Sequence, residues 1–272
     1  MQLSPPNVLT IAASDPTGGA GIQADIMTIA SCGCHALSVI TALTVQDTRG
    51  IESMRPIEAG WVEAQARALM ADMAVSVFKI GLTGSLENIE VIAGILSDYP
   101  DIPVVLDPVL ASGRGDALAD EDMISALIKW LLPFTDILTP NSLEARKLID
   151  QSFKENSGTE WSLAEYAERL IALGCDHVLL TGTHEDTPQV VNDLYSKDGL
   201  LCSDRWERLP DSYHGSGCTL ASAVAAHLAH GLPISDAVHE AQNYTWQTLK
   251  AGFRAGRGQF IPNRFFRSRH GE

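Results

Sequence analysis

The chain has 272 residues, with 34 acidic side chains against 19 basic ones and a formal net charge of −15. This excess of negative charge argues against a nucleic-acid backbone or an anionic membrane as a partner, but it leaves room for a phosphate ligand held by Mg²⁺ and backbone N–H groups. The chain shows no signal-peptide pattern and no apolar run of about 18 residues, and its five cysteines include no CxxC pair. We therefore expect a cytoplasmic protein with free thiols.

Short apolar runs alternate with longer amphipathic segments along the first two thirds of the chain. The short runs are rich in β-branched residues and predict strands, whereas the amphipathic segments predict helices. The predicted strands are residues 7–13, 35–43, 75–81, 103–109, 136–140 and 177–182. The predicted helices that separate them are residues 21–32, 57–73, 87–98, 121–132, 142–150 and 162–174.

The helix predicted over residues 57–73 shows which of its sides is expected to face the core. Helical spacing places Trp61, Ala64, Ala68 and Leu69 on the inner face. The segment that precedes this helix, which includes "QDTRGI", is expected to be a loop.

The last third of the chain has a different pattern. Two alternating runs flank "SKDG" within residues 190–206 and predict an antiparallel hairpin, and two long helices, about 217–231 and 234–251, close the chain. Strands that alternate with helices predict right-handed crossovers and an α/β fold with a mostly parallel central sheet. No linker divides residues 1–272, so we expect a single domain whose ligands bind outside the carboxyl ends of the strands.

The segment "DPTGGAGIQAD" (15–25) places three glycines before a predicted helix. N–H groups at such a helix start favour anions or polar ligand atoms. The spacing matches neither G-x-G-x-x-G nor the Walker pattern, so the alternative is a tight turn from strand to helix. Asp25 lies one turn into the helix, where it is either a ligand contact or a solvated first-turn aspartate.

The segment "TPNSLE" (139–144) places Asn141 and Glu144 three residues apart at the start of a helix, on one side. Mg²⁺ prefers oxygen ligands and keeps several waters, so this pair is a candidate anchor for it. The alternative is an ordinary N-cap in which Asn141 or Ser142 caps the helix, and taken alone the segment favours that alternative. Asp107, at the end of the strand "PVVLD", is a further candidate ligand for the same ion.

The segment "HGSGCT" (214–219) leads directly into an alanine-rich helix. Its glycines free successive N–H groups, which suits a phosphoryl group in transfer. A thiol at this place is expected to have its pKa lowered by the helix dipole, although Cys218 as a packing residue is an equal alternative. His214, His227 and His230 fit no metal-binding spacing and are expected to be surface or capping residues.

Together these segments resemble the hydroxymethylpyrimidine/phosphomethylpyrimidine kinases of thiamine biosynthesis, in the ribokinase-like superfamily. The resemblance covers essentially the whole chain, through "LTIAASDPTGGAGIQADIMTIASCG", "SVITALTVQDTRGI", "KIGLTGS", "VVLDPV", "LTPNSLEA" and "HGSGCTLASA". It implies a three-layer α/β/α sandwich with an edge hairpin and a homodimer. It also implies phosphorylation of the pyrimidine's hydroxymethyl group and then of its monophosphate, with ATP and Mg²⁺.

The same resemblance assigns roles to individual residues. Asp25 and Gln46 are expected to hydrogen-bond the aminopyrimidine ring, with Ala13, Gly19 and Ala20 also at the substrate. The residues expected at ATP are Asn141, Thr181, Gly182 and Ser216. Those expected at Mg²⁺ are Glu144 and Asp107, and those expected in the catalytic anion hole are Gly215, Gly217 and Cys218, with the cysteine as the base.

The chain departs from many relatives of this family at two positions. Thr181 stands where a lysine is expected near the ATP phosphates, and Arg114 is a candidate source of the missing charge. Ala13 replaces a glycine and adds a methyl group beside the pyrimidine pocket. Three other interpretations remain: a pyridoxal kinase-like activity, a pyrimidine-binding protein without catalysis, and, least supported by the glycine spacing, a dinucleotide-dependent oxidoreductase.

Overall fold

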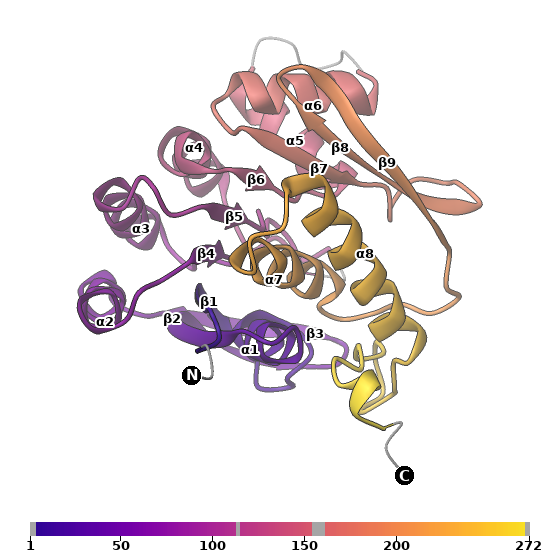
Figure 1. Cartoon of the computed structure of the whole chain (residues 1–272), viewed down its shortest axis with the longest axis horizontal. Helices are drawn as coiled ribbons and strands as arrows, with labels where there is room; N and C mark the ends of the chain where they lie inside the picture. Colours follow the sequence, from indigo (N-terminus) through magenta and orange to yellow (C-terminus); the bar gives the residue numbers. More distant parts are fainter. Residues whose placement is uncertain (1–3, 113–114, 154–160, 270–272) are drawn as a thin grey trace.

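The computed structural model describes residues 4–112, 115–153 and 161–269, so the Arg114 hypothesis lies outside the described residues. Within them nine strands form one sheet, in the order β3-β2-β1-β4-β5-β6-β7-β8-β9 (Figure 1). The strands are β1 (Asn7–Ser14), β2 (His35–Asp47), β3 (Gly50–Pro56), β4 (Val77–Ile80), β5 (Val104–Leu106), β6 (Ile137–Leu138), β7 (His177–Thr181), β8 (Gln189–Ser196) and β9 (Gly199–Glu207).

The centre of the sheet is parallel and both of its edges are antiparallel. The pairs from β2 through β1, β4, β5 and β6 to β7 are parallel, whereas β3 pairs with β2, β8 with β7 and β9 with β8 in the antiparallel sense. The mostly parallel sheet and the edge hairpin over 190–206 are therefore confirmed. The loop expected at "QDTRGI" is wrong, since β3 begins within it; β3 is largely exposed and gains its order from pairing with β2.

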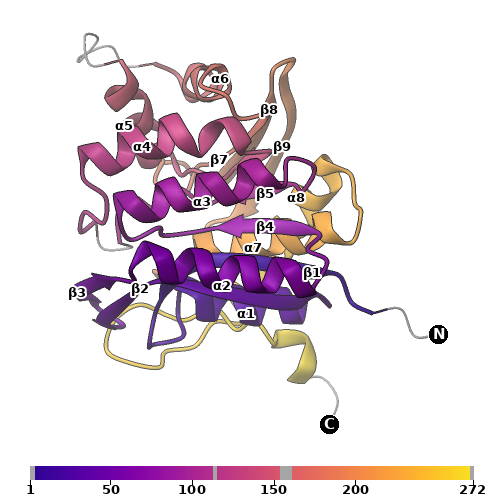
Figure 2. The ribbon, with the colours of Figure 1, turned by 90° about the vertical axis from the view of Figure 1, so that its left-hand side faces the viewer.

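Helices cover both faces of the sheet (Figures 1 and 2). One apolar cluster contains residues of α2 to α6, and a second contains residues of α1, α7 and α8. This arrangement is the expected three-layer sandwich. The helices are α1 (Gly21–Ser31), α2 (Ala59–Asp72), α3 (Leu86–Asp98), α4 (Glu121–Trp130), α5 (Ser142–Ser152), α6 (Leu163–Ala172), α7 (Ser216–Ala229) and α8 (Ile234–Lys250). Among the described helices, none is long and apolar enough to cross a lipid bilayer.

The predicted inner face of α2 is wrong by one residue. Val62 and Ala66 are the fully buried positions, whereas Trp61 is 66% exposed. Ala64 and Ala68 are exposed as well, and Leu69 is partly buried. Neighbouring residues of a helix point about 100° apart. Counting the large apolar side chain of Trp61 as buried therefore placed the predicted inner face on the wrong side of the helix.

Helix α7 lies at the centre of its layer and positions the end of "HGSGCT". Its residues from Thr219 to Ala226 are buried, and it packs against α1, α8 and the sheet. Small side chains allow this close approach, because a long side chain would push the neighbouring backbones apart. The N-terminus of α7 consequently lies against Asp107, which follows β5 at the carboxyl edge of the sheet.

Candidate active site

A buried ion pair lies at the centre of the carboxyl edge of the sheet. Lys79 of β4 and Asp25 of α1 are both 0% exposed, and the lysine Nζ lies 3.0 Å from each carboxylate oxygen. Thr10 of β1 and Ser222 of α7 donate to the same carboxylate at 2.6 and 2.8 Å. The pair thus joins four elements, and each charge is compensated, as burial requires.

The position of Asp25 rules out the solvated first-turn aspartate. Lysine, threonine and serine donors surround its fully buried carboxylate, and its expected contact with the pyrimidine stays a prediction. Its role in this structure is to hold Lys79 in place. Burial alone would lower the pKa of Lys79, but the charges of Asp25 and Asp107 raise it above its ordinary value, so the lysine carries a full positive charge.

Asp107 brings a second carboxylate next to the lysine. It is 5% exposed, its Oδ2 lies 4.0 Å from Lys79 Nζ, and that oxygen has no hydrogen-bond partner. Burial raises the pKa of Asp107 to about 6, against the effect of the lysine. The thiol of Cys218 donates to this carboxylate, and the N–H of Gly21 donates to the Cys218 sulfur. The cysteine therefore links the start of α7 to β5 and α1.

The expected lowering of the Cys218 pKa is wrong. Burial, followed by the negative charge of Asp107, raises the pKa of Cys218 to about 12. The partial positive charge of a helix N-terminus falls off within one turn and here acts against both effects. At neutral pH the group is a thiol that donates a hydrogen bond, not a thiolate that accepts a proton.

Asn141 and Glu144 form the capping box that was the alternative interpretation of "TPNSLE". The Asn141 side chain accepts from the N–H groups of Leu143 and Glu144 at 3.0 and 2.9 Å, and Glu144 accepts from the Asn141 N–H at 2.9 Å. Burial, and then the charge of Asp107, raise the pKa of Glu144 to about 8. Glu144 thus belongs both to the cap of α5 and to an acidic pair with Asp107.

Mg²⁺ fits the donor set that Asp107 and Glu144 offer. Both carboxylates are almost buried, each raises the energy of the other's charge, and the Oδ2 atom of Asp107 lacks a partner. A hard cation favours such oxygens, and Mg²⁺ commonly takes one or two carboxylates together with waters and phosphate oxygens. The described residues contain no group of three or more His, Cys, Asp or Glu side chains that could hold a metal alone.

Two glycine loops meet in front of α7. Gly215 has φ 81°, in the left-handed region, and a Cβ there would collide with the carbonyl oxygen of Gly19. A Cβ on Gly19 would in turn collide with the ring of His214. Only glycine permits this contact of backbone with backbone, which leaves the first N–H groups of α7 open to a ligand.

A histidine–aspartate pair ties the same two loops together. His214 Nε2 lies 2.9 Å from Asp15 Oδ2, and the N–H groups of Ala20 and Thr17 donate to the same carboxylate. Burial would raise the pKa of Asp15, but these hydrogen bonds with His214, Ala20 and Thr17 bring it below its ordinary value. The expectation that His214 is a surface or capping residue is therefore wrong, since its side chain is only 12% exposed and pairs with Asp15 of the other loop.

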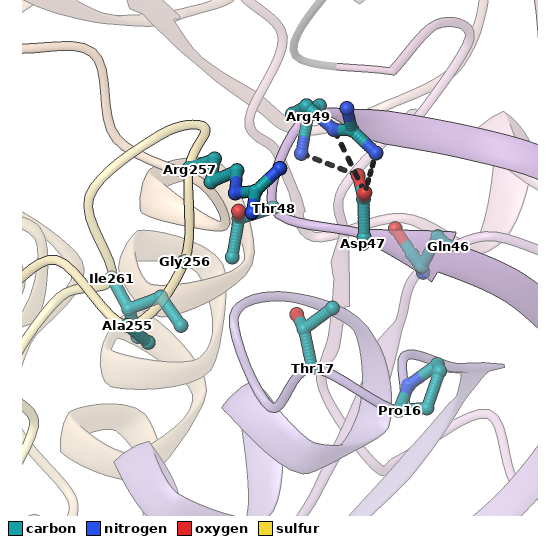
Figure 3. A pocket seen from close by; sticks show the side chains of 10 residues that line it. All are labelled: Pro16, Thr17, Gln46, Asp47, Thr48, Arg49, Ala255, Gly256, Arg257 and Ile261. Carbon is teal, nitrogen blue, oxygen red and sulfur yellow. Dashed lines mark hydrogen bonds and ion pairs between the residues drawn. The ribbon is translucent and has the colours of Figure 1, made fainter.

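A cavity of about 470 Å³ opens beside these loops (Figure 3). Gln46 lines it; its Nε2 donates to Thr44 at 2.6 Å, and its Oε1 has no hydrogen-bond partner. The lining does not include Asp25 or the other predicted pyrimidine contacts, which are Ala13, Gly19 and Ala20. The lining residues are Pro16, Thr17, Gln46, Asp47, Thr48, Arg49, Ala255, Gly256, Arg257 and Ile261.

The residues expected at ATP gather at the ends of β6 and β7. Thr181 is bridged to Asn141, and its hydroxyl lies 3.5 Å from the carbonyl of Pro140. A Cβ on Gly182 would collide with the carbonyl of Val191, so this position requires glycine. Ser216 opens α7. The structure brings these residues to the carboxyl edge of the sheet.

Comparison with known proteins agrees with this arrangement. The family model described as phosphomethylpyrimidine kinase matches residues 15–263. The chain belongs to this family. It is 39% identical over 253 residues to the hydroxymethylpyrimidine/phosphomethylpyrimidine kinase of Rhizobium meliloti, covering 92% of this chain and 93% of the relative. It is 37% identical over 243 residues to the Escherichia coli protein of the same name, covering 89% and 90%.

Solved structures of vitamin kinases share the fold. The phosphomethylpyrimidine kinase of Clostridium difficile superposes with a TM-score of 0.76 at 33% identity, covering 90% of this chain and 99% of that one. An ADP complex of the Bacillus subtilis pyridoxal kinase gives a TM-score of 0.84 at 26% identity, covering 96% and 98%. The chain is a phosphotransferase with a ribokinase-like fold, as the sequence resemblance implied.

Removal of the buried lysine should test whether the ion pair supports the fold. We expect Lys79→Met to lower the free energy of unfolding by about 3–5 kcal/mol, because Asp25 is left buried without its cation. Lys129→Met, at an exposed position on α4, is the control and should cost less than about 1 kcal/mol. Urea titration followed by circular dichroism measures both, and equal losses would contradict the prediction.

The protonation state of Cys218 can be measured by alkylation. With a thiol pKa of about 12, we expect iodoacetamide to modify Cys218 slowly at pH 7.5. The rate should still rise about tenfold per pH unit between pH 7 and 9, because the thiolate fraction rises in that proportion. Peptide mass spectrometry assigns the modified site. A rate that levels off below pH 9 would show an activated thiolate instead.

Proposed function

We propose that this chain transfers the γ-phosphoryl group of ATP to the hydroxymethyl group of 4-amino-5-hydroxymethyl-2-methylpyrimidine, and then phosphorylates the resulting monophosphate to the diphosphate. The observation that carries the proposal is the open N-terminus of α7 beside Asp107 and Lys79, within a chain of the phosphomethylpyrimidine kinase family. Helix N-termini bind phosphate groups through free N–H donors. The two named relatives are described as kinases of both pyrimidine substrates.

Gln46 is the proposed pyrimidine contact. Its Oε1 is a buried acceptor without a partner, and the residue lines a cavity large enough for a single aromatic ring. The exocyclic amine of the aminopyrimidine is a matching donor, and pairing it would remove the cost of an unsatisfied buried oxygen. Thr44 fixes the other end of the amide, so the acceptor is held in one orientation.

The phosphoryl group is proposed to lie at the first turn of α7. The N–H groups of Gly217 and Cys218 point from the helix start, and the charge of Lys79 lies behind Asp107. Phosphoryl transfer depends mainly on position and charge stabilisation, so a strong base is not required. Cys218 is proposed to hold Asp107 and the start of α7 in place as a thiol.

ATP is proposed to lie along the ends of β6 and β7, against Asn141, Thr181, Gly182 and Ser216. Asp107 and Glu144 would hold Mg²⁺ there. When bound, the ion supplies positive charge to the phosphate oxygens. Thr181 offers a hydroxyl in place of a charged ammonium. Stabilisation of the nucleotide's negative charge therefore depends more strongly on the helix N-terminus and the ion.

We also propose that residues 1–272 act as one domain, and that two chains form a homodimer in the cytoplasm. Leu43 and Val45 on β2 are 49% and 57% exposed. Because they alternate along one strand, they lie on the same face of it. Burial of apolar side chains of this size against a second chain contributes favourable free energy to association.

An ATP-dependent assay with the hydroxymethylpyrimidine tests the proposed reaction directly. We expect ADP to form only when the pyrimidine is added, with the monophosphate appearing before the diphosphate, and turnover to stop with EDTA. Chromatography separates the two products, and pyridoxal is assayed in parallel because a vitamin kinase of that type shares the fold. A higher kcat/KM for pyridoxal, or ADP formation without substrate, would contradict the proposal.

A pair of glycine variants provides the control for this assay. Gly215→Ala should abolish turnover, because the added Cβ collides with Gly19 at the anion-binding turn. Gly231→Ala at the other end of α7 introduces the same left-handed strain (φ 80°) with no atom within 4 Å, and should keep turnover.

Replacement of Gln46 tests where the pyrimidine binds. We expect Gln46→Leu to raise the KM for the pyrimidine about tenfold or more while the KM for ATP stays unchanged, because one hydrogen bond to the ring amine is lost. Gln46→Glu keeps an acceptor oxygen and should retain more affinity. Gln151→Leu on α5, where the side-chain amide donates to two residues of α4, is the matched control. A KM increase confined to ATP would place the pyrimidine elsewhere.

A further inference from the structure

Arg264 is a large charged side chain that the fold buries almost completely. It lies between α8 and the short 3₁₀ helix η3 (Phe266–Arg269) and is 2% exposed. Its Nη1 and Nη2 donate to the carbonyl oxygens of Gly18 and Gly19 at 3.1 and 2.6 Å. These carbonyls belong to the glycine loop that precedes α1, so the C-terminal segment reaches into the opposite end of the chain.

The third donor of the same guanidinium serves the other glycine loop. Arg264 Nε donates to Thr219 Oγ1 at 3.1 Å, and Thr219 Oγ1 donates to the carbonyl of Gly215 at 2.8 Å. The planar fork therefore holds Gly18 and Gly19 directly and Gly215 through one hydroxyl. A lysine would offer a single nitrogen and could not reach all three points in this geometry.

The backbone of Arg264 is itself fixed from two helices. Its carbonyl accepts from Ser31 of α1 at 2.7 Å and from Tyr244 of α8 at 2.8 Å. Arg267 in the same segment differs, because it is exposed and lies over the rings of Tyr244 and Phe266. Arg264 is thus directed inward by the fold and is not a surface arginine that happens to touch a loop.

Asp25 and Asp15 offset the charge of Arg264 from a distance. Within the described part of the chain it forms no ion pair within 4.0 Å, and each of its three nitrogens donates one hydrogen bond to a carbonyl or a hydroxyl. A buried charge is costly, and an apolar side chain of similar volume would avoid that cost. The arrangement therefore favours the position of the loops over stability, and it places a positive charge among the acidic side chains behind the start of α7.

We propose that Arg264 is a positioning residue of the phosphoryl-transfer site, which holds the loop at 15–21 against the loop at 214–218 and adds fixed positive charge behind the anion-binding turn. This inference rests on the proposed kinase function. When the two loops separate, water reaches the γ-phosphorus in place of the pyrimidine hydroxyl. The bond to the β-phosphate oxygen then breaks, and ATP and water give ADP, inorganic phosphate and a proton without a phosphorylated pyrimidine.

The test compares Arg264→Met with Arg267→Met and the unchanged protein. We expect Arg264→Met to lower kcat for pyrimidine phosphorylation about 100-fold, with little change in the KM for ATP, because misplaced reacting groups reduce rate more than binding. The ratio of ADP to phosphorylated pyrimidine should rise above one. Arg264→Lys, which keeps the charge but not the fork, should give an intermediate kcat, and Arg267→Met should behave as the unchanged protein.

A second measurement separates loop position from folding and from the substrate. Circular dichroism gives the folded fraction, and iodoacetamide alkylation of Cys218 reports the opening of the loops without any substrate. Alkylation should be faster in Arg264→Met than in Arg267→Met. The proposal is overturned if Arg264→Met has the same kcat and the same alkylation rate as the protein without substitutions. It is also overturned if kcat falls only in proportion to the folded fraction and the ratio of ADP to phosphorylated pyrimidine stays at one. If the unchanged protein does not phosphorylate the pyrimidine, the proposed function fails, and the alkylation comparison still decides the role of Arg264.

Discussion

The buried pair of Asp25 and Lys79 is the interaction on which the site geometry depends. It joins α1 and β4 directly, and Thr10 and Ser222 extend it to β1 and α7. Because an unpaired charge in the interior costs several kcal/mol, all four elements must keep their mutual positions for the chain to remain folded. The lysine in turn faces Asp107, so the acidic edge of the sheet has a fixed positive charge behind it.

The close approach of two loops is the second constraint, and it follows from small residues. The alanines of α7 let the helix lie between α1 and α8, and the contact of Gly215 with Gly19 brings its first turn against the loop after β1. The pairs of Asp15 with His214 and of Arg264 with both loops lie around this contact. Residues near the start of the chain, residues 214 and 215, and Arg264 near its end thus combine to form the proposed anion-binding turn.

The sequence allowed every strand of the described sheet except β3, as well as the helices, the edge hairpin and the glycine turns, to be predicted, because each is specified by local spacing. The acidic positions Asp107 and Glu144 could also be predicted, since they end a strand and begin a helix. Lys79 could not, because a lysine within "VFKIG" is indistinguishable from a snorkelling edge residue until its partner is known. Arg264 and His214 were missed for the same reason: their partners lie 245 and 199 positions away.

The role of Cys218 shows how local and long-range effects compete at this site. Its place at a helix start suggested an activated thiolate, but Asp107 arrives from β5 and burial removes water, and both raise the pKa of the thiol. The same burial that makes Cys218 a weak base strengthens the charge interactions around the proposed phosphoryl position. A site of this kind gains rate by holding N–H groups, Lys79 and carboxylates in place. In a loose transition state the hydroxyl proton leaves late, so the weak base costs little.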